Sequence, residues 1–287
     1  MTVTVDAQRL APNHPLGSEA QATPHYQAEL NAPASPTPTS RAQVAATVPV
    51  IFSQLASTTT RNLDKGEPLY IQGEVATSTY VVEAGLVALS LNARPDRERI
   101  IGLAGPGDLV GALTTGQGEY LESAHALSQG VAIRTVPVDQ LTDGSTTLTA
   151  EESAAMSRAA GQHLANLTRL LEDSETPVPA RVARTLLRLG DRFGQWVEDG
   201  NAAAVTERSA GHRSQSAGSG RRAGRRVRLT LPLTHETIAN MVGAARETTT
   251  STIEQMRRGG LVHGTRGRYV IDVDGLTDYA NEAAAAS

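Results

Sequence analysis

Residues 234–261 read THETIANMVGAARETTTSTIEQMRRGGL, and this stretch predicts two short helices joined by a tight turn. Thr234 is a good N-cap, and from Ile238 onward apolar residues recur at helical spacing. Gly243 suits a left-handed turn that ends the first helix, and a second helix then begins at Ala245–Arg246. Two helices around a short glycine turn are typical of a helix-turn-helix, whose second helix lies in the major groove of DNA.

Polar side chains at the start of the second predicted helix suit the reading of DNA bases. An arginine can donate two hydrogen bonds to guanine, and a glutamate can accept one from cytosine. A carboxylate that faced only phosphates would be repelled, so Glu247 favours a base contact over an ordinary solvated helix carrying a local Arg–Glu pair. The predicted base-reading residues are Arg246, Glu247, Thr250 and Ser251.

The flanking sequence predicts a winged fold around these helices. Residues 226–233 alternate between apolar and polar like a strand, and residues 261–271 resemble a β-hairpin. Arg266 and Arg268 lie near the tip of that hairpin, where a wing would contact phosphates.

The motif T-H-E-x-I-A-x-x-V-G-x-x-R-E-T, which begins at Thr234, resembles the DNA-binding domain of the cyclic-AMP receptor protein/fumarate-nitrate regulator (Crp/Fnr) family. The resemblance covers roughly Val50–Val273. It implies an α+β fold with an N-terminal cyclic-nucleotide-binding-like β-barrel (a jelly roll), a long dimerisation helix and a C-terminal winged helix-turn-helix. It further implies a homodimer that binds double-stranded DNA and RNA polymerase. Thr234 and His235 stand where members contact phosphate, often through an arginine at the second position.

Bulk composition is compatible with that reading and excludes some alternatives. The length of 287 residues suggests two domains, and the net charge of −4 requires any basic surface to be local. The absence of cysteine excludes disulfides and a cysteine-bound iron–sulfur cluster. A histidine-held haem is not excluded in this way, and its candidates are His125 and His163; we expect no cofactor or metal. No membrane segment or signal peptide is predicted, so we expect a cytoplasmic location.

The domain organisation follows from shifts in composition. Residues 1–45 are rich in Ala, Pro, Ser and Thr and predict a disordered tail. Residues 46–148 contain short strand-like runs separated by glycine turns, typical of a small barrel. Residues 176–280 form the predicted winged helix-turn-helix. It contains a Gly-, Ser- and Arg-rich insertion at about 199–224, which is either a supplementary phosphate contact or an idle loop.

Residues 149–175 predict one long helix after the barrel. Its narrow apolar stripe either forms a dimer seam or packs on the chain's own barrel, and the family resemblance favours the dimer. The predicted seam residues are Met156, Ala160, Leu164, Leu167 and Leu171.

The resemblance also places a cyclic-nucleotide cassette in the barrel, and this chain departs from it at both polar ends. In members that bind cyclic AMP, a glutamate holds the ribose and an arginine neutralises the cyclic phosphate. Here Ala112 replaces that glutamate and Glu122 replaces that arginine, although the spacing is kept. Two anions repel each other, so we expect the barrel to bind something else or nothing. The cassette positions are Gly107, Gly111, Ala112, Leu113, Glu122 and Ser123.

The motifs bear on four candidate functions. The favoured one is a dimeric, sequence-specific regulator of transcription that does not depend on cyclic AMP. Its alternative is an effector-dependent Crp-type activator with a divergent cassette. An enzyme lacks support, since no G-x-S-x-G, phosphate-binding loop, H-E-x-x-H or cysteine nucleophile is present. Arg246 and Glu247 argue against an adaptor that has lost DNA binding.

Overall fold

A computed structural model describes residues 58–94, 97–111, 118–142, 148–197, 224–265 and 267–286 of the chain. The predicted tail, Ala112, Leu113, Arg266 and nearly all of the predicted insertion lie outside these residues. No helix in these ranges is long and apolar enough to cross a membrane.

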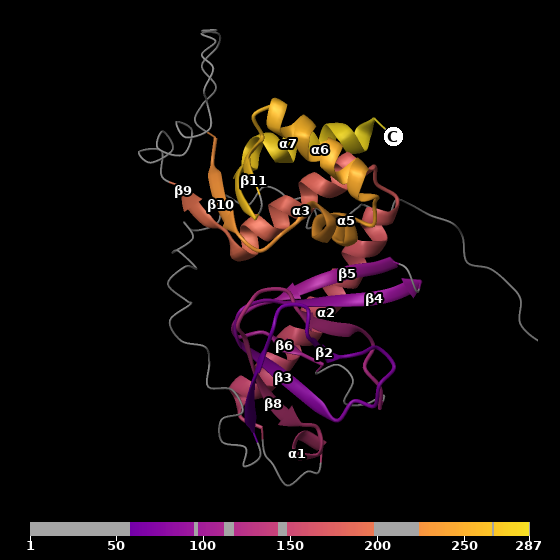
Figure 1. Ribbon diagram of the computed structural model, residues 1–287, viewed down its shortest axis with the longest axis vertical. Coiled ribbons are helices and arrows are strands. Elements are labelled where there is room, and N and C mark those ends of the chain that lie inside the picture. The colour runs from indigo at the N-terminus through magenta and orange to yellow at the C-terminus, as the bar shows by residue number, and fades with distance from the viewer. Residues whose placement is uncertain are drawn as a thin grey trace, which may run out of the picture. The chain divides into compact units, whose positions relative to one another are not determined.

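The first part of the described chain is a β-structure built from short antiparallel strands (Figure 1). The elements are β1 (Thr59–Leu63), β2 (Pro68–Tyr70), β3 (Ser78–Ala84), β4 (Val87–Arg94), β5 (Arg97–Ala104), β6 (Leu109–Val110), β7 (Ser123–Ala126), β8 (Val131–Pro137) and α1 (Asp139–Thr142). One sheet has the order β1-β8-β3-β6 and the other β2-β7-β4-β5. Apolar side chains from both sheets share one core, which includes Leu63, Val82, Val87 and Ile133. The expected barrel is therefore confirmed as a fold.

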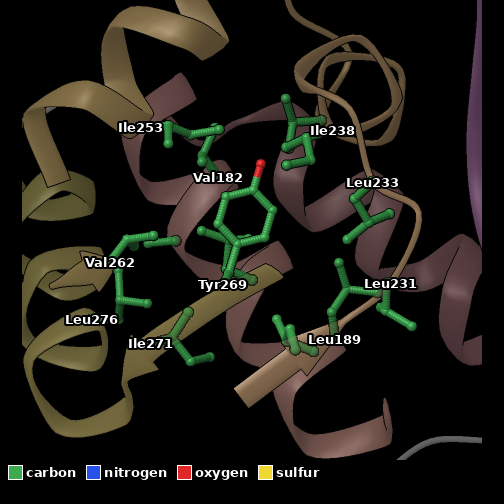
Figure 2. Close-up of a cluster of buried hydrophobic side chains, with 14 of the residues drawn as sticks. Val182, Leu189, Leu231, Leu233, Ile238, Ile253, Val262, Tyr269, Ile271 and Leu276 are labelled. Atoms are coloured by element: carbon green, nitrogen blue, oxygen red, sulfur yellow. The ribbon is translucent and has the colours of Figure 1, made fainter. Parts of the chain in front are cut away.

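A long helix and a second α/β unit follow. The elements are α2 (Ala150–Ser174), α3 (Val178–Phe193), β9 (Gln195–Val197), β10 (Arg226–Thr230), α5 (His235–Val242), α6 (Arg246–Arg258), β11 (Val262–Thr265), β12 (Arg268–Asp272) and α7 (Val273–Ala285). The antiparallel sheet of this unit has the order β11-β12-β10-β9. Figure 2 shows Tyr269 of β12 among Val182 of α3, Ile238 of α5 and Ile253 of α6. One buried core thus joins the wing to the helix pair.

The two prolines after α2 lie at the start of α3. The sequence pattern predicts a break over Glu175–Pro179 and a helix that begins at Ala180, but α3 begins at Val178. Pro177 is its N-cap and Pro179 lies in its first turn, where a missing N–H costs nothing. The prolines therefore start the helix, and the break is confined to the residues after Ser174.

Several elements were not predicted from the sequence, namely β1, β6, β7, α1, β9 and α7. In α7 only Leu276 and Ala280 are buried, which leaves a weak periodic signal. Its N-cap Asp272, whose side chain accepts a hydrogen bond from Gly275 N at 3.0 Å, was a readable start signal.

Candidate nucleic-acid interface and ligand site

The turn between α5 and α6 is built from local backbone chemistry. Thr234 Oγ1 accepts a hydrogen bond from Thr237 N at 3.0 Å, which caps α5 as its sequence predicts. Gly243 ends α5 in the left-handed region with φ of 63°. Ala244 N donates to Ala239 O at 3.1 Å, so the chain turns at once into α6.

The second helix has one buried and one exposed face. Ile253 and Met256 are buried in the core of the unit, and the hydroxyls of Thr249 and Thr252 bond to carbonyls four residues earlier. The opposite face carries Arg246, Glu247 and Ser251, all exposed. Within the described part of the chain, neither Arg246 nor Glu247 forms an ion pair. Their polar groups are available to a ligand rather than to each other.

Thr250 differs from the other three predicted base-reading residues. It is half-buried, and its Oγ1 lies 3.0 Å from Nδ1 of His235 on α5. This contact occupies both the threonine hydroxyl and one nitrogen of the predicted phosphate-binding histidine. The pair therefore joins the beginning of α5 to α6, a role that sequence spacing alone does not reveal.

The charge state of His235 follows from the same surroundings. Burial lowers the pKa of its imidazole below the ordinary value of 6.5. The positive charges of Arg257 and Arg246 lower that pKa further, whereas Glu254 partly offsets them. A neutral imidazole is therefore favoured in the free protein at neutral pH.

The wing is fixed to the helix pair through a glycine. Gly267 has φ of 79°, and its carbonyl accepts a hydrogen bond from Leu231 N at 2.9 Å. A Cβ atom added at Gly267 would lie 2.0 Å from Leu231 O, so no other residue fits without a backbone shift. Arg268 is exposed beside it. The tip of the hairpin is thereby held next to the segment that leads into α5.

The barrel retains the turns of the predicted cassette. Gly107 and Gly111 both have positive φ, 88° and 76°, and Gly107 N donates to Val82 O at 2.8 Å. A Cβ atom at Gly111 would lie 3.3 Å from both Ser78 O and the Tyr120 ring. The glycines of the cassette therefore shape the backbone, whatever the barrel binds.

Glu122 is enclosed in the barrel, with 3% of its surface exposed. Tyr70 donates its hydroxyl hydrogen to Glu122 Oε1 at 2.9 Å. Ser123, the other cassette residue there, accepts a hydrogen bond from Gln72 N at 3.0 Å. Its hydroxyl thus stabilises a turn of the barrel.

Three tyrosines form a stack, and one of them, Tyr70, is the residue that donates to Glu122. The ring of Tyr70 lies 4.0 Å from that of Tyr120 and 5.7 Å from that of Tyr80. Burial, then the negative charge of Glu122 and the hydrogen bond to it, raise the pKa of Tyr70 well above its ordinary value. Tyr70 therefore stays protonated and acts as the donor to Glu122.

The apolar stripe of α2 is divided between the barrel and solvent. Met156 packs near Val81 and Val136, and Leu167 packs against the barrel core. Leu164 and Leu171 are 66% and 72% exposed. Leu164 and Leu167 lie roughly 60° apart around the helix axis. This rotation is enough for Leu167 to face the barrel while Leu164 faces solvent.

A regular exposed row remains on α2. Its members Ser157, Gly161, Leu164, Thr168 and Leu171 follow steps of four and three residues. This spacing is that of a coiled-coil seam.

Comparison with known proteins identifies two domain families in the chain. Residues 180–279 match the Crp-like helix-turn-helix domain, and residues 60–143 match the cyclic nucleotide-binding domain. The CRP-like cAMP-activated global transcriptional regulator of Mycobacterium tuberculosis is 27% identical over 203 residues, 69% of this chain and 77% of that protein.

Solved structures show the same fold. FixK2 from Bradyrhizobium japonicum superposes with a TM-score of 0.59 at 18% identity, covering 78% of this chain and 97% of that one. TTHA1359, a CRP/FNR-family transcriptional regulator from Thermus thermophilus, gives 0.55 at 22% identity, covering 78% of this chain and 100% of that one. With both domain families present in order, the chain belongs to the Crp/Fnr family of DNA-binding transcription regulators, which are not enzymes.

Proposed function

We propose that this regulator binds a near-palindromic DNA site as a homodimer, in the cytoplasm, and without cyclic AMP. The observation that carries the DNA-reading part is the exposed, unpaired couple Arg246 and Glu247 at the N-terminal end of α6. Arg246 donates to a guanine and Glu247 accepts from a cytosine in the major groove. Ser251 adds a short contact on the same face, and Thr250 acts mainly by holding His235.

Phosphate contacts flank these bases in the proposed complex. Thr234 and His235 at the start of α5 face one strand, and the wing brings Arg268 to another stretch of backbone. Arg266, which the sequence predicts for the same wing tip, lies outside the described residues. Loss of Arg268 therefore weakens binding to all DNA sequences about equally and lowers the dependence on salt.

The homodimer is supported by the exposed row on α2. Leu164 and Leu171 stand one heptad apart, and Gly161 in the same row lets a second helix approach closely. Two-fold symmetry then places the two copies of α6 in successive major grooves, roughly one helical turn of DNA apart.

Sedimentation of the full chain tests the dimer. We expect Leu164→Glu together with Leu171→Glu to give a monomer at micromolar concentration that binds a palindrome no better than a half-site. The control is Val75→Glu on the barrel, where a similarly exposed residue (70%) receives one glutamate, as each of the two leucines does. A native protein that sediments as a monomer both free and on DNA would refute the proposal.

Independence from cyclic AMP is supported by Glu122. A buried carboxylate at the place of the phosphate-binding arginine replaces a charge-assisted bond with repulsion between anions. Calorimetry should detect no saturable binding of cyclic AMP, and a DNA titration should give equal affinities with and without it. A micromolar dissociation constant accompanied by a gain of about tenfold or more in DNA affinity would establish the opposite.

One alternative has an observation in its favour. The relative from Mycobacterium tuberculosis is described as cAMP-activated, so a cyclic-nucleotide-dependent activator with a divergent cassette remains the second candidate. The same calorimetry and DNA titration separate the two. Contact with RNA polymerase, as an activator or otherwise, is a family expectation that no surface described above supports directly.

A further inference from the structure

A cavity of about 590 Å³ is lined by residues of the barrel, of α2 and of α3, together with Met241 of α5, and Glu122 is among the barrel residues that line it. Apolar walls come from Leu89, Ile101 and Leu109, and Asn166 of α2 adds a polar group. This volume falls within the range of about 300–1,000 Å³ that is typical of small-molecule sites.

The carboxylate of Glu122 is incompletely satisfied in this cavity. Its Oε1 accepts from Tyr70, whereas Oε2 is buried and has no hydrogen-bond partner among the residues that the structure describes. A buried acceptor left in this state costs about 1–3 kcal/mol, and more when it is charged. A carboxylate can only accept, so the missing partner must be a donor.

The neighbouring buried carboxylate shows what Glu122 lacks. Asp173 also lines the cavity and is 6% exposed, and Arg188 donates to its Oδ2 at 2.8 Å. Glu122 has no such cation within the described ranges of the chain. Among the residues that the structure describes, the cavity therefore presents one buried carboxyl group without an ion-pair partner.

We propose that the cavity binds a small molecule with a cationic nitrogen, a guanidinium or ammonium group, which donates to Glu122 Oε2. The inference rests on the proposed loss of cyclic-nucleotide binding, because it assigns the same barrel a ligand of opposite charge. A cationic donor satisfies the free oxygen and neutralises the carboxylate in one contact. The apolar walls receive the carbon chain of the ligand. Arg158 and Arg169, exposed on α2 at the same cavity, favour an anionic group at the other end.

Tyr70 is the positioning residue of this site. Its hydroxyl holds Oε1, so the ligand finds only Oε2 open, and stacking on Tyr120 fixes the ring. Tyr70→Phe leaves the charge in place and should change cation affinity less than removal of the carboxylate does.

The test is calorimetry on the full chain with two matched probe pairs. Arginine and n-butylguanidinium carry the cation, while citrulline and n-butylurea have the same shapes without the charge. We expect saturable binding of the two cations and at least about tenfold weaker binding of the neutral analogues. Absence of saturable binding of both cations, or equal binding of the charged and neutral members, overturns the inference.

Glu122→Gln keeps the size of the side chain and an oxygen for Tyr70, so it should fold and be no less stable in urea. We expect it to lose the preference for cations. Glu119→Gln, an exposed barrel residue, makes the same change in net charge and should leave binding unaltered. Equal loss of cation binding in Glu122→Gln and Glu119→Gln would reveal a general charge effect and would refute the proposed site. Cyclic AMP is titrated separately: its binding would refute the proposed function, whereas failure of the guanidinium probes alone would refute only this inference.

Discussion

The helix-turn-helix and the barrel cassette keep their family pattern in different ways. In the first, both the turn at Gly243 and the exposed Arg246 and Glu247 agree with the motif. In the second, Gly107 and Gly111 preserve the turns, but the buried Glu122 stands where the family resemblance leads one to expect an arginine. The backbone turns of the cassette are thus kept although the side chain at this position has changed, and the proposed loss of cyclic-AMP binding depends on that change.

The largest predicted effect is a loss of stability caused by a backbone change in the DNA-binding domain. Gly267→Ala should lower the free energy of unfolding by about 3 kcal/mol, because positive φ and the close carbonyl of Leu231 both oppose a Cβ atom. Urea unfolding followed by the fluorescence of Trp196, the only tryptophan, measures it within the same sheet. Gly260→Ala is the control: its φ of 71° is equally strained, but nothing lies within 4 Å. It should cost about 1 kcal/mol, and equal losses would contradict the contact argument.

A smaller effect is expected when a DNA-contacting side chain is removed and the fold is left intact. Arg246→Ala should weaken binding to the cognate site by about 1–3 kcal/mol and flatten the preference for one guanine. Arg258→Ala removes an exposed arginine from the other end of the same helix, roughly 18 Å away. Fluorescence anisotropy on cognate and scrambled duplexes should show a change in specificity only for Arg246. Parallel losses on both duplexes for the two variants would mean that Arg246 contacts phosphate.

The smallest effect concerns the protonation of His235. Its pKa is lowered in the free protein, so this residue contributes stability above pH 6.5 that is lost as pH falls through the lowered pKa. A nearby phosphate favours the protonated ring, so DNA binding takes up a proton and becomes stronger as pH falls. Between about pH 8 and pH 6 we expect a gain of about threefold in affinity, measured by anisotropy at constant ionic strength. His235→Asn should abolish this gain, whereas His263→Asn, exposed on β11, should retain it. A pH profile unchanged in His235→Asn would exclude the phosphate contact.

Local signals account for what the sequence could predict. The cap at Thr234 and the turn at Gly243 are each encoded within a few residues, and the structure contains both. The presence of Glu122 where the family cassette has an arginine could also be predicted, because the cassette keeps its spacing. Contacts between residues far apart in the sequence could not be predicted. Tyr70 lies 52 residues from Glu122, and no periodicity relates them.

The dimer stripe shows the same limit within a single helix. Apolar residues at three- and four-residue steps predicted one seam, yet Met156 and Leu167 pack on the barrel while Leu164 and Leu171 stay exposed. Periodicity identifies an amphipathic helix but not which neighbour covers each part of its apolar surface. That assignment depends on how the helix lies on the β-strands.

The small apolar content of the exposed row has a consequence for gene control. Two leucines from each copy contribute roughly 6–12 kcal/mol when buried, against about 4–15 kcal/mol lost in association. Because the two ranges overlap, we expect the proposed homodimer to dissociate on dilution, which sedimentation over a series of concentrations would measure. Occupancy of a two-fold operator then rises with the square of the monomer concentration. A modest change in synthesis rate would switch the target genes sharply, so the abundance of the protein would itself carry the signal.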